Sequence, residues 1–149
     1  MSGRSTTGSA HDGVDGAGPP VGPMTGLSHV QLRVTDVAAS AEWYTVALGL
    51  VPFQADPAIG YVALRHPTSG VVIVLTSDTS GTWRADGGAL DHLAFVVPDG
   101  AALEAWAARL TASGIDHPGV VPEGGNPSLQ LRDPDGTAVE LVAPRPRGH

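Results

Sequence analysis

An internal repeat constrains the fold of this chain more than any other feature of its sequence. His29 recurs 63 positions later as His92, and Asp36 recurs at the same interval as Asp99. Towards the end of each copy the interval grows to 66 positions, a drift that short loop insertions account for. A repeat of this size indicates two copies of one supersecondary unit. The other matched pairs are Trp43 with Trp106, Gly70 with Gly136, and Leu75 with Leu141.

The first copy shows the pattern of a strand, a helix and three further strands. Residues 29–34 alternate polar and apolar side chains, which is typical of a half-buried strand. Apolar residues then recur at helical spacing from Val37 to Leu48, between Asp36 as N-cap and Gly49 as a C-terminal stop. Further strands are expected around 51–53, 61–64 and 71–76.

The second copy follows the same order. Residues 90–96 read as its first strand, and a helical face from Leu103 to Leu110 is opened by Asp99 and closed by Gly114. Further strands are expected near Val120, at 128–131 and at 137–142, with the last two joined by a turn at 133–136 that Asp133 and Asp135 fix.

These patterns predict an α+β fold of paired βαβββ modules. The modules occupy about residues 27–77 and 90–143, within one domain of residues 26–144. Each module supplies a curved sheet with a helix on its outer face, so two sheets set side by side are expected to enclose a cavity. Gly, Ser, Thr and Pro dominate residues 1–25, which predicts a flexible tail, and residues 145–149 form a short C-terminal tail.

Composition excludes several classes of function. The chain has eight Lys and Arg residues and a net charge of −7, so it lacks the basic surface that nucleic acid or anionic lipid requires. It contains no cysteine, which excludes disulfides and thiolate metal ligands. It has no apolar run of about 18 residues and no signal-like start, which favours a cytoplasmic protein. Met24, just before the first patterned segment, is a candidate start codon.

Strand parity places three potential metal ligands on the sheet faces turned away from the helices. His29 and His92 occupy the same place in their repeats, and Glu140 lies in the last strand between apolar neighbours. A carboxylate there is costly unless it is paired or bound to a metal. Two imidazoles and one carboxylate form a three-ligand set that leaves positions open for water and substrate. We therefore predict a divalent cation on these three residues, with Glu140 as the candidate catalytic group.

Other polar residues on the same faces carry less weight. Gln31, Arg33, Tyr61 and Gln130 are candidate substrate-pocket residues, although they also fit the rim of a curved sheet. Taken alone, each histidine also fits a hydrogen-bonded strand residue. The repeat symmetry of the two histidines is what favours the metal site.

Residues 27–143 resemble the vicinal oxygen chelate superfamily. The segments that carry the resemblance are LSHVQLRVTD, EWYTVALGL, DHLAFVV and LRDPDGTAVELVAP. That family contains glyoxalase I, extradiol dioxygenases, fosfomycin-resistance enzymes, methylmalonyl-CoA epimerase and the metal-free bleomycin-resistance proteins. The resemblance implies the glyoxalase/bleomycin resistance/dihydroxybiphenyl dioxygenase fold and a cofactor that is Fe2+, Mn2+, Zn2+ or Ni2+.

The sequence departs from each of these subgroups. Glyoxalase I-like members carry a fourth ligand where this chain has Val74, the repeat counterpart of Glu140. Extradiol dioxygenases carry a tyrosine where this chain has Gln130, and a histidine upstream that residues 123–127 lack. Fosfomycin enzymes bind a phosphonate with several cationic side chains, whereas this chain has no lysine. The arginines that remain for that role are Arg33, Arg65, Arg84 and Arg132.

The sequence is therefore interpreted as a metal-dependent lyase, isomerase or dioxygenase of this superfamily acting on a small oxygenated molecule. The alternative is a protein that sequesters a small ligand, as the bleomycin-resistance relatives do. A homodimer is expected, because the sheets leave open edges and related two-module chains pair, some of them exchanging modules.

Overall fold

The computed structural model describes residues 22–78, 88–123 and 126–145 of the chain. The predicted tails at 1–25 and 145–149 fall mainly outside these ranges, as does Arg84. None of the helices in the described ranges is long and apolar enough to cross a membrane.

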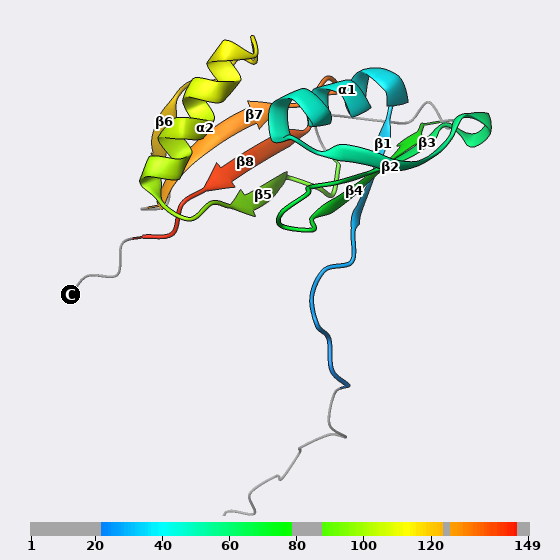
Figure 1. Ribbon diagram of the computed structural model, residues 1–149, viewed down its shortest axis with the longest axis horizontal. Helices are drawn as coiled ribbons and strands as arrows, with labels where there is room; N and C mark the ends of the chain where they lie inside the picture. The colour runs from blue at the N-terminus through cyan, green and yellow to red at the C-terminus, as the bar shows by residue number, and fades with distance from the viewer. Residues whose placement is uncertain (1–21, 79–87, 124–125, 146–149) are drawn as a thin grey trace, which may run out of the picture.

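The order of elements confirms the predicted pair of βαβββ modules (Figure 1). The first module contains β1 (Val30–Val34), α1 (Val37–Leu48), β2 (Val51–Asp56), the short 3-10 helix η1 (Pro57–Ile59), β3 (Tyr61–Arg65) and β4 (Val72–Ser77). The second contains β5 (His92–Val96), α2 (Gly100–Ala112), β6 (Val120–Glu123), β7 (Asn126–Arg132) and β8 (Ala138–Val142). The pattern did not predict η1.

Strand pairing shows that the sequence repeat is also a structural repeat. The sheets have the orders β1-β4-β3-β2 and β5-β8-β7-β6. In each sheet the first strand of the module pairs in parallel with the fourth: β1 with β4, and β5 with β8. Gln31 lies opposite Val74 in the first sheet, and Ala94 lies opposite Glu140 in the second. The sequence offsets therefore hold in strand register, and Val74 is the structural counterpart of Glu140.

The helices begin where the sequence predicts. Asp36 and Asp99 each accept a hydrogen bond from the backbone N–H three positions ahead, at 2.9 and 2.8 Å. Gly49 ends α1 with φ of 70°, a conformation that suits glycine. The second helix stops at Ala112, two residues before the predicted stop at Gly114.

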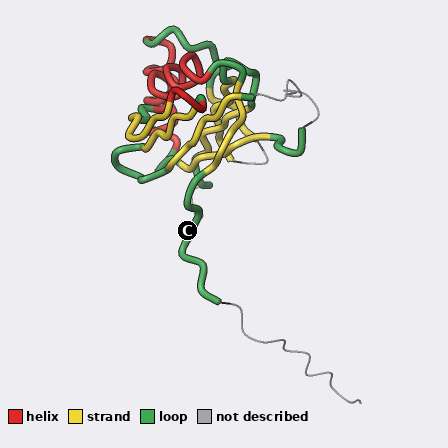
Figure 2. Tube along the Cα trace, turned by 90° about the vertical axis from the view of Figure 1, so that its right-hand side faces the viewer, coloured by secondary structure: helices red, strands yellow, loops and turns green. Residues whose placement is uncertain are grey.

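Both helices lie on the same side of the two sheets (Figures 1 and 2). Apolar residues alternate along the strands with polar or exposed ones, so one face of each sheet is apolar and packs under the helices. The helix-facing side chains of both modules together form one core. The largest fully buried side chains include Tyr44, Leu50, Leu64, Ile73, Leu75, Leu103, Leu110 and Leu129. The opposite face of the second sheet carries His92 and Glu140.

A hydrogen-bonded group that we call the inter-module clamp joins the two modules. The buried Tyr44 hydroxyl of α1 donates to Asp133 Oδ2 at 3.0 Å, and Asp133 Oδ1 accepts from the backbone of Asp135 and Thr137 at 3.0 and 2.8 Å. Asp135 in turn accepts from the backbone N–H of Thr35 at 2.9 Å and from its hydroxyl. The Asp133 side chain therefore fixes the turn as predicted. The Asp135 side chain instead bonds to Thr35, so it holds the first module against the turn.

Burial governs the ionisation of the clamp. Desolvation raises the pKa of Asp133 above its ordinary value of 3.8, although the hydrogen bonds that the carboxylate accepts act in the opposite direction. Desolvation also raises the pKa of the Tyr44 hydroxyl, and the negative charge of Asp133 adds to that shift. Tyr44 therefore stays protonated and acts as a donor.

The edge strand β2 is the most open part of the first sheet. All six of its residues are exposed, and Phe53 is 48% exposed with the Arg65 guanidinium 4.3 Å above its ring. On β5, the edge strand of the second sheet, Val96 is 79% exposed. Exposed apolar side chains on two edge strands are typical of a surface that another chain covers.

Candidate functional site

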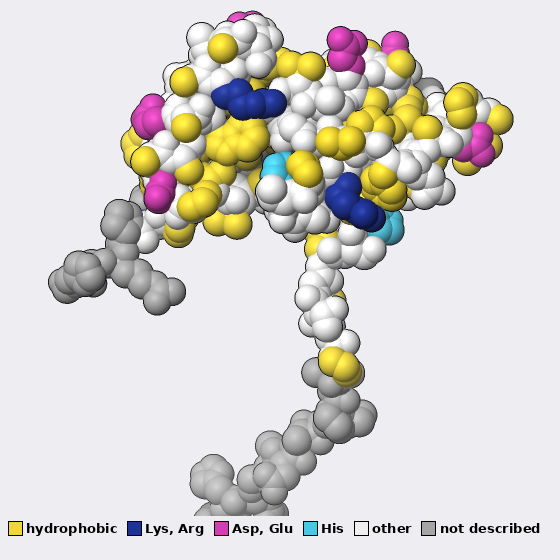
Figure 3. All heavy atoms as spheres, viewed as in Figure 1, with side chains coloured by type: hydrophobic (Ala, Val, Ile, Leu, Met, Phe, Trp, Pro, Cys, Tyr) yellow, Lys and Arg dark blue, Asp and Glu magenta, His cyan; other side chains and the backbone are white. Residues whose placement is uncertain are grey.

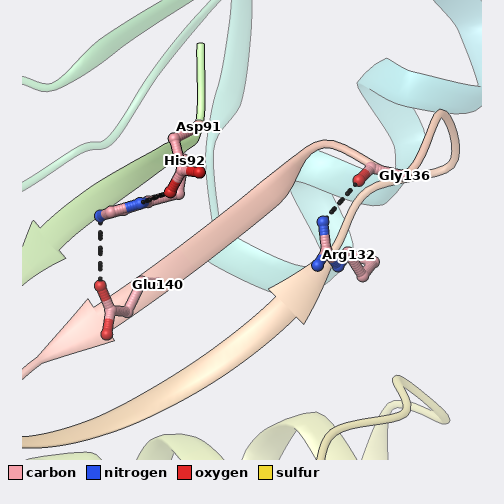
Figure 4. Close-up of polar contacts among 5 residues, drawn as sticks. All are labelled: Asp91, His92, Arg132, Gly136 and Glu140. Carbon is pink, nitrogen blue, oxygen red and sulfur yellow. Dashed lines mark hydrogen bonds and ion pairs between the residues drawn. The ribbon is translucent and has the colours of Figure 1, made fainter. Parts of the chain in front are cut away.

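His92 and Glu140 approach each other on the open face of the second sheet (Figure 4). His92 begins β5, and Glu140 lies in the neighbouring strand β8, opposite Ala94. Because side chains alternate along a strand, both project away from the core-facing Leu93 and Val139. His92 Nε2 is 3.6 Å from Glu140 Oε2, which is longer than a hydrogen bond.

The separation of these two atoms fits two ligands of one cation. Metal–ligand bonds of about 2.1 Å at angles between 90° and tetrahedral place neighbouring donor atoms about 3.0–3.4 Å apart. The observed 3.6 Å reaches that range with a small side-chain adjustment. The Glu140 side chain is only 13% exposed, so its carboxylate has limited access to water. A mostly buried carboxylate beside an imidazole is a donor set suited to a divalent cation.

Asp91 adds a contact that sequence reasoning missed. Its Oδ2 lies 2.6 Å from His92 Nδ1, on the side of the ring opposite Glu140 (Figure 4). A carboxylate that holds the second ring nitrogen of a histidine is a common feature of metal sites. The signal was present in the Asp-His dipeptide at the start of the strand.

The third predicted ligand lies elsewhere in the chain. His29 is exposed and directly precedes β1, with its Nδ1 3.1 Å from the Ser28 hydroxyl. Among the described residues of one chain, no three His, Asp or Glu side chains gather closely enough to hold a metal. The structure thus brings together His92 and Glu140 but not His29, and one chain does not enclose all three as the side-by-side arrangement of its sheets led us to expect.

The predicted pocket residues divide between the two sheets. Gln31 and Arg33 are exposed on β1, and Tyr61 is half-buried at the start of β3. Val74 is buried, with 5% exposure, between Gln31 and Ala63. Only Gln130 belongs to the sheet of Glu140, and it lies directly opposite that residue in register.

A separate cavity of about 520 Å3 lies between the modules and contains none of the predicted site residues. Its wall is mainly apolar and includes Phe95, Trp106 and Leu141, with His66 at one side. Figure 3 shows hydrophobic surface gathered between α2 and the first module. The His66 Nδ1 accepts a hydrogen bond from the Ser69 backbone at 3.2 Å, so this imidazole serves the β3–β4 turn. The chemistry of the candidate site therefore lies away from the cavity.

Two proteins of named activity are similar to this chain in sequence. The chain is 32% identical over 124 residues to biphenyl-2,3-diol 1,2-dioxygenase 3 of Rhodococcus globerulus, which covers 77% of this chain and 61% of that protein. It is 28% identical over 125 residues to a probable lactoylglutathione lyase of Vibrio cholerae, covering 78% of this chain and 88% of that one. The chain thus spans less than two thirds of the dioxygenase, which has further sequence of its own.

Solved structures agree with the fold. A glyoxylase/bleomycin resistance protein/dioxygenase domain from Frankia matches with a TM-score of 0.68 and 30% identity, over 85% of this chain and 96% of that one. The fosfomycin resistance protein FosX of Listeria monocytogenes matches with a TM-score of 0.64 over 83% of this chain and 96% of that one, at 19% identity, which shows a shared fold alone. The family model of the Glyoxalase/Bleomycin resistance protein/Dioxygenase superfamily matches residues 26–141. The chain therefore belongs to this superfamily, which confirms the resemblance drawn from its sequence.

Proposed function

We propose that the protein is a metal-dependent enzyme acting on a small oxygenated molecule, with a divalent cation held by His92 and Glu140 of one chain and His29 of a second copy. The observation that carries this proposal is the 3.6 Å approach of His92 Nε2 to Glu140 Oε2 on an open sheet face. The named relatives, a dioxygenase and a probable lyase, support an enzymatic function.

The need for a second copy follows from the separation of the ligands. Within the described part of one chain, His29 does not join His92 and Glu140 in a cluster. His29 directly precedes β1 and His92 begins β5, and these two strands are edge strands of different sheets. Exposed apolar residues on β2 and β5 supply surface for a homodimer contact. A two-fold dimer that sets the first sheet of one chain against the second sheet of its partner would form two equivalent sites.

A cation bound there would act as a Lewis acid towards two adjacent oxygens of the substrate. The ligand set of two imidazoles and one carboxylate suits Fe2+, Mn2+, Zn2+ or Ni2+. Glu140 is the candidate catalytic group, because its carboxylate faces the open side of the sheet and can accept a proton there. Gln130, Gln31, Arg33 and Tyr61 are the side chains placed to contact substrate from the two sheets.

The position of Val74 argues for a three-ligand site. Val74 occupies in the first sheet the strand position that Glu140 occupies in the second. Its apolar side chain neither binds a metal nor transfers a proton. Chemistry that requires carboxylates from both modules is therefore disfavoured. Reactions in which substrate occupies the open positions of a three-ligand metal remain compatible with the residues present.

Metal analysis tests this proposal against the ligand-sequestering alternative. We expect the chain to bind one divalent cation per site in calorimetry, and His92→Ala to abolish that binding. His66→Ala is the matched control, because it removes an imidazole that serves a turn. Absence of stoichiometric binding of Mn2+, Fe2+, Zn2+ and Ni2+ by the wild-type protein would contradict the proposal and favour a metal-free binding protein.

A further inference from the structure

We infer that the substrate of the proposed enzyme carries a carboxylate group, which Arg132 recognises from the same sheet face as His92 and Glu140. The inference rests on the proposed function and names the chemical class of substrate for that site. Three observations carry it: the strand register around Arg132, the hydrogen bond that holds its guanidinium, and the recurrence of the arrangement in the first module.

Strand register places Arg132 in one row with His92. Arg132 of β7 lies opposite Ala138 of β8, and Ala138 lies opposite His92 of β5. Residues paired across neighbouring strands project from the same face of a sheet. Arg132 is exposed there, whereas the preceding Leu131 is buried in the core. Neighbouring strands lie about 4.8 Å apart, so the Cα atoms of Arg132 and His92 are separated by about 10 Å. A small substrate bound beside His92 and Glu140 therefore has the long Arg132 side chain within reach of its far end.

One hydrogen bond holds the Arg132 guanidinium at the end of β7. Its Nη1 donates to the Gly136 carbonyl oxygen at 3.0 Å, in the turn that joins β7 to β8 (Figure 4). Within the described part of the chain, no Asp or Glu forms an ion pair with Arg132. An arginine presents five N–H donors, so one bond to a carbonyl leaves donors and the positive charge for an anion.

The geometry and the charge of this site favour a carboxylate. The planar guanidinium matches the two oxygens of a carboxylate. The four described strands of the second sheet contain no other Lys or Arg, so a single negative charge is matched better than a phosphate dianion. The net charge of the chain is −7, which repels anions at long range. Selection of an anionic substrate therefore needs a local cation such as Arg132.

The same arrangement recurs on the first sheet. Arg65 lies opposite Val72, which is the repeat counterpart of Ala138 at the 66-residue interval. Arg65 therefore occupies on the first sheet the place of Arg132 on the second. His29 directly precedes the edge strand β1, as His92 begins the edge strand β5. The repeat thus carries an arginine together with each histidine, although the chain has only eight Lys and Arg residues.

The two sheets differ in what accompanies the arginine. On the first sheet Val74 takes the place of Glu140, and the Arg65 guanidinium lies 4.3 Å from the centroid of the Phe53 ring. On the second sheet Arg132 shares its face with the two proposed ligands of one chain. Arg132 is therefore the arginine that we assign to the substrate.

Two ligands of similar shape but different charge test this inference on the full-length protein. Protocatechuate and its neutral amide, protocatechuamide, each offer two adjacent oxygens to a cation, but only the first carries a carboxylate. In calorimetric titration of the Zn2+-loaded protein, we expect the acid to bind about 10-fold more tightly than the amide, because hydrogen bonds between charged groups are the stronger ones. Arg132→Met should abolish this preference by weakening acid binding alone. Arg132→Lys, which keeps the charge without the planar fork, should give an intermediate preference.

A matched control separates contact with Arg132 from net charge. Arg109 lies on α2 and donates to the Ala47 carbonyl, so Arg109→Met removes the same charge on the helix side and should keep the preference for the acid. Equal weakening of both ligands by Arg132→Met would indicate a purely structural role in the turn and would overturn the inference. Equal affinities of the wild-type protein for acid and amide, or an equal loss of preference in Arg109→Met, would also overturn it while the metal site stands. If a preceding titration shows that the wild-type protein binds no Zn2+, the proposed function fails first and the inference falls with it.

Discussion

Removal of the Tyr44 hydroxyl tests how strongly the inter-module clamp holds the two modules. Tyr44→Phe keeps the buried ring and its packing but deletes the 3.0 Å hydrogen bond to Asp133. A hydrogen bond to a charged group contributes about 1.5–3 kcal/mol. Asp133 retains two backbone donors after the change, so we expect a loss near the lower end, about 1.5–2 kcal/mol. At about 2–4 °C per kcal/mol for a chain of this size, the melting temperature should fall by roughly 3–8 °C.

Urea unfolding followed by circular dichroism measures this loss. The other tyrosine gives the matched control, because the Tyr61 hydroxyl makes no hydrogen bond within the described part of the chain. Tyr61→Phe should therefore change the unfolding free energy by less than about 0.5 kcal/mol. Equal effects of the two substitutions, or a Tyr44→Phe effect below 0.5 kcal/mol, would refute the idea that the clamp carries a strong hydrogen bond.

Three further predictions follow from single residues. Burial raises the folded-state pKa of Asp133 above 3.8, so its protonated form stabilises the fold at low pH, and this stabilisation is lost as pH rises through the raised pKa. Asn cannot ionise, so the free energy of unfolding in urea should fall less with rising pH in Asp133→Asn than in the wild type. Gly60→Ala should cost about 1–3 kcal/mol, because φ is +60° and a Cβ would meet Ser77 Oγ at 1.8 Å, whereas Gly70→Ala, at φ +74° with open space, should cost less. Lactoylglutathione lyase activity should stay below a typical enzyme rate, on the order of 10 per second, because Val74 offers no second carboxylate. Turnover at or above that rate with any of the four candidate metals would show that Val74 has been overinterpreted.

The fold followed from the sequence because its signals are local and repeated. Asp36 and Asp99 sit at the helix starts that their side-chain chemistry favours, and the 63- and 66-residue offsets recur in the strand register. Alternation along β5 and β8 also predicted that His92 and Glu140 share one face of their sheet, as the strand register has them. Caps and alternation depend on near neighbours in the chain, and the repeat is visible by direct comparison of the two halves, so pattern alone is enough to find these features.

The site was harder to predict because it depends on how the modules sit relative to each other. Parity assigns His29 and His92 to equivalent faces but does not say whether those faces meet within one chain. The clamp around Tyr44 and Asp133 is one of the contacts that hold the modules together, and it spans 89 positions that no local pattern links. Asp91 was missed for a different reason, since an acidic residue before a strand has no periodic signature of its own.

In the proposed site each cation draws ligands from two chains, and complementation between two variants that each lack one ligand histidine tests this arrangement most directly. His29→Ala and His92→Ala chains, expressed separately, should each bind no metal with high affinity. In a mixed dimer one site receives both intact histidines and the other receives neither, so random pairing should restore about a quarter of the wild-type sites. Calorimetry on the co-expressed pair measures this fraction. Recovery of about a quarter of the sites is the predicted result, and mixed dimers that bind no metal while the wild-type protein does would contradict the account.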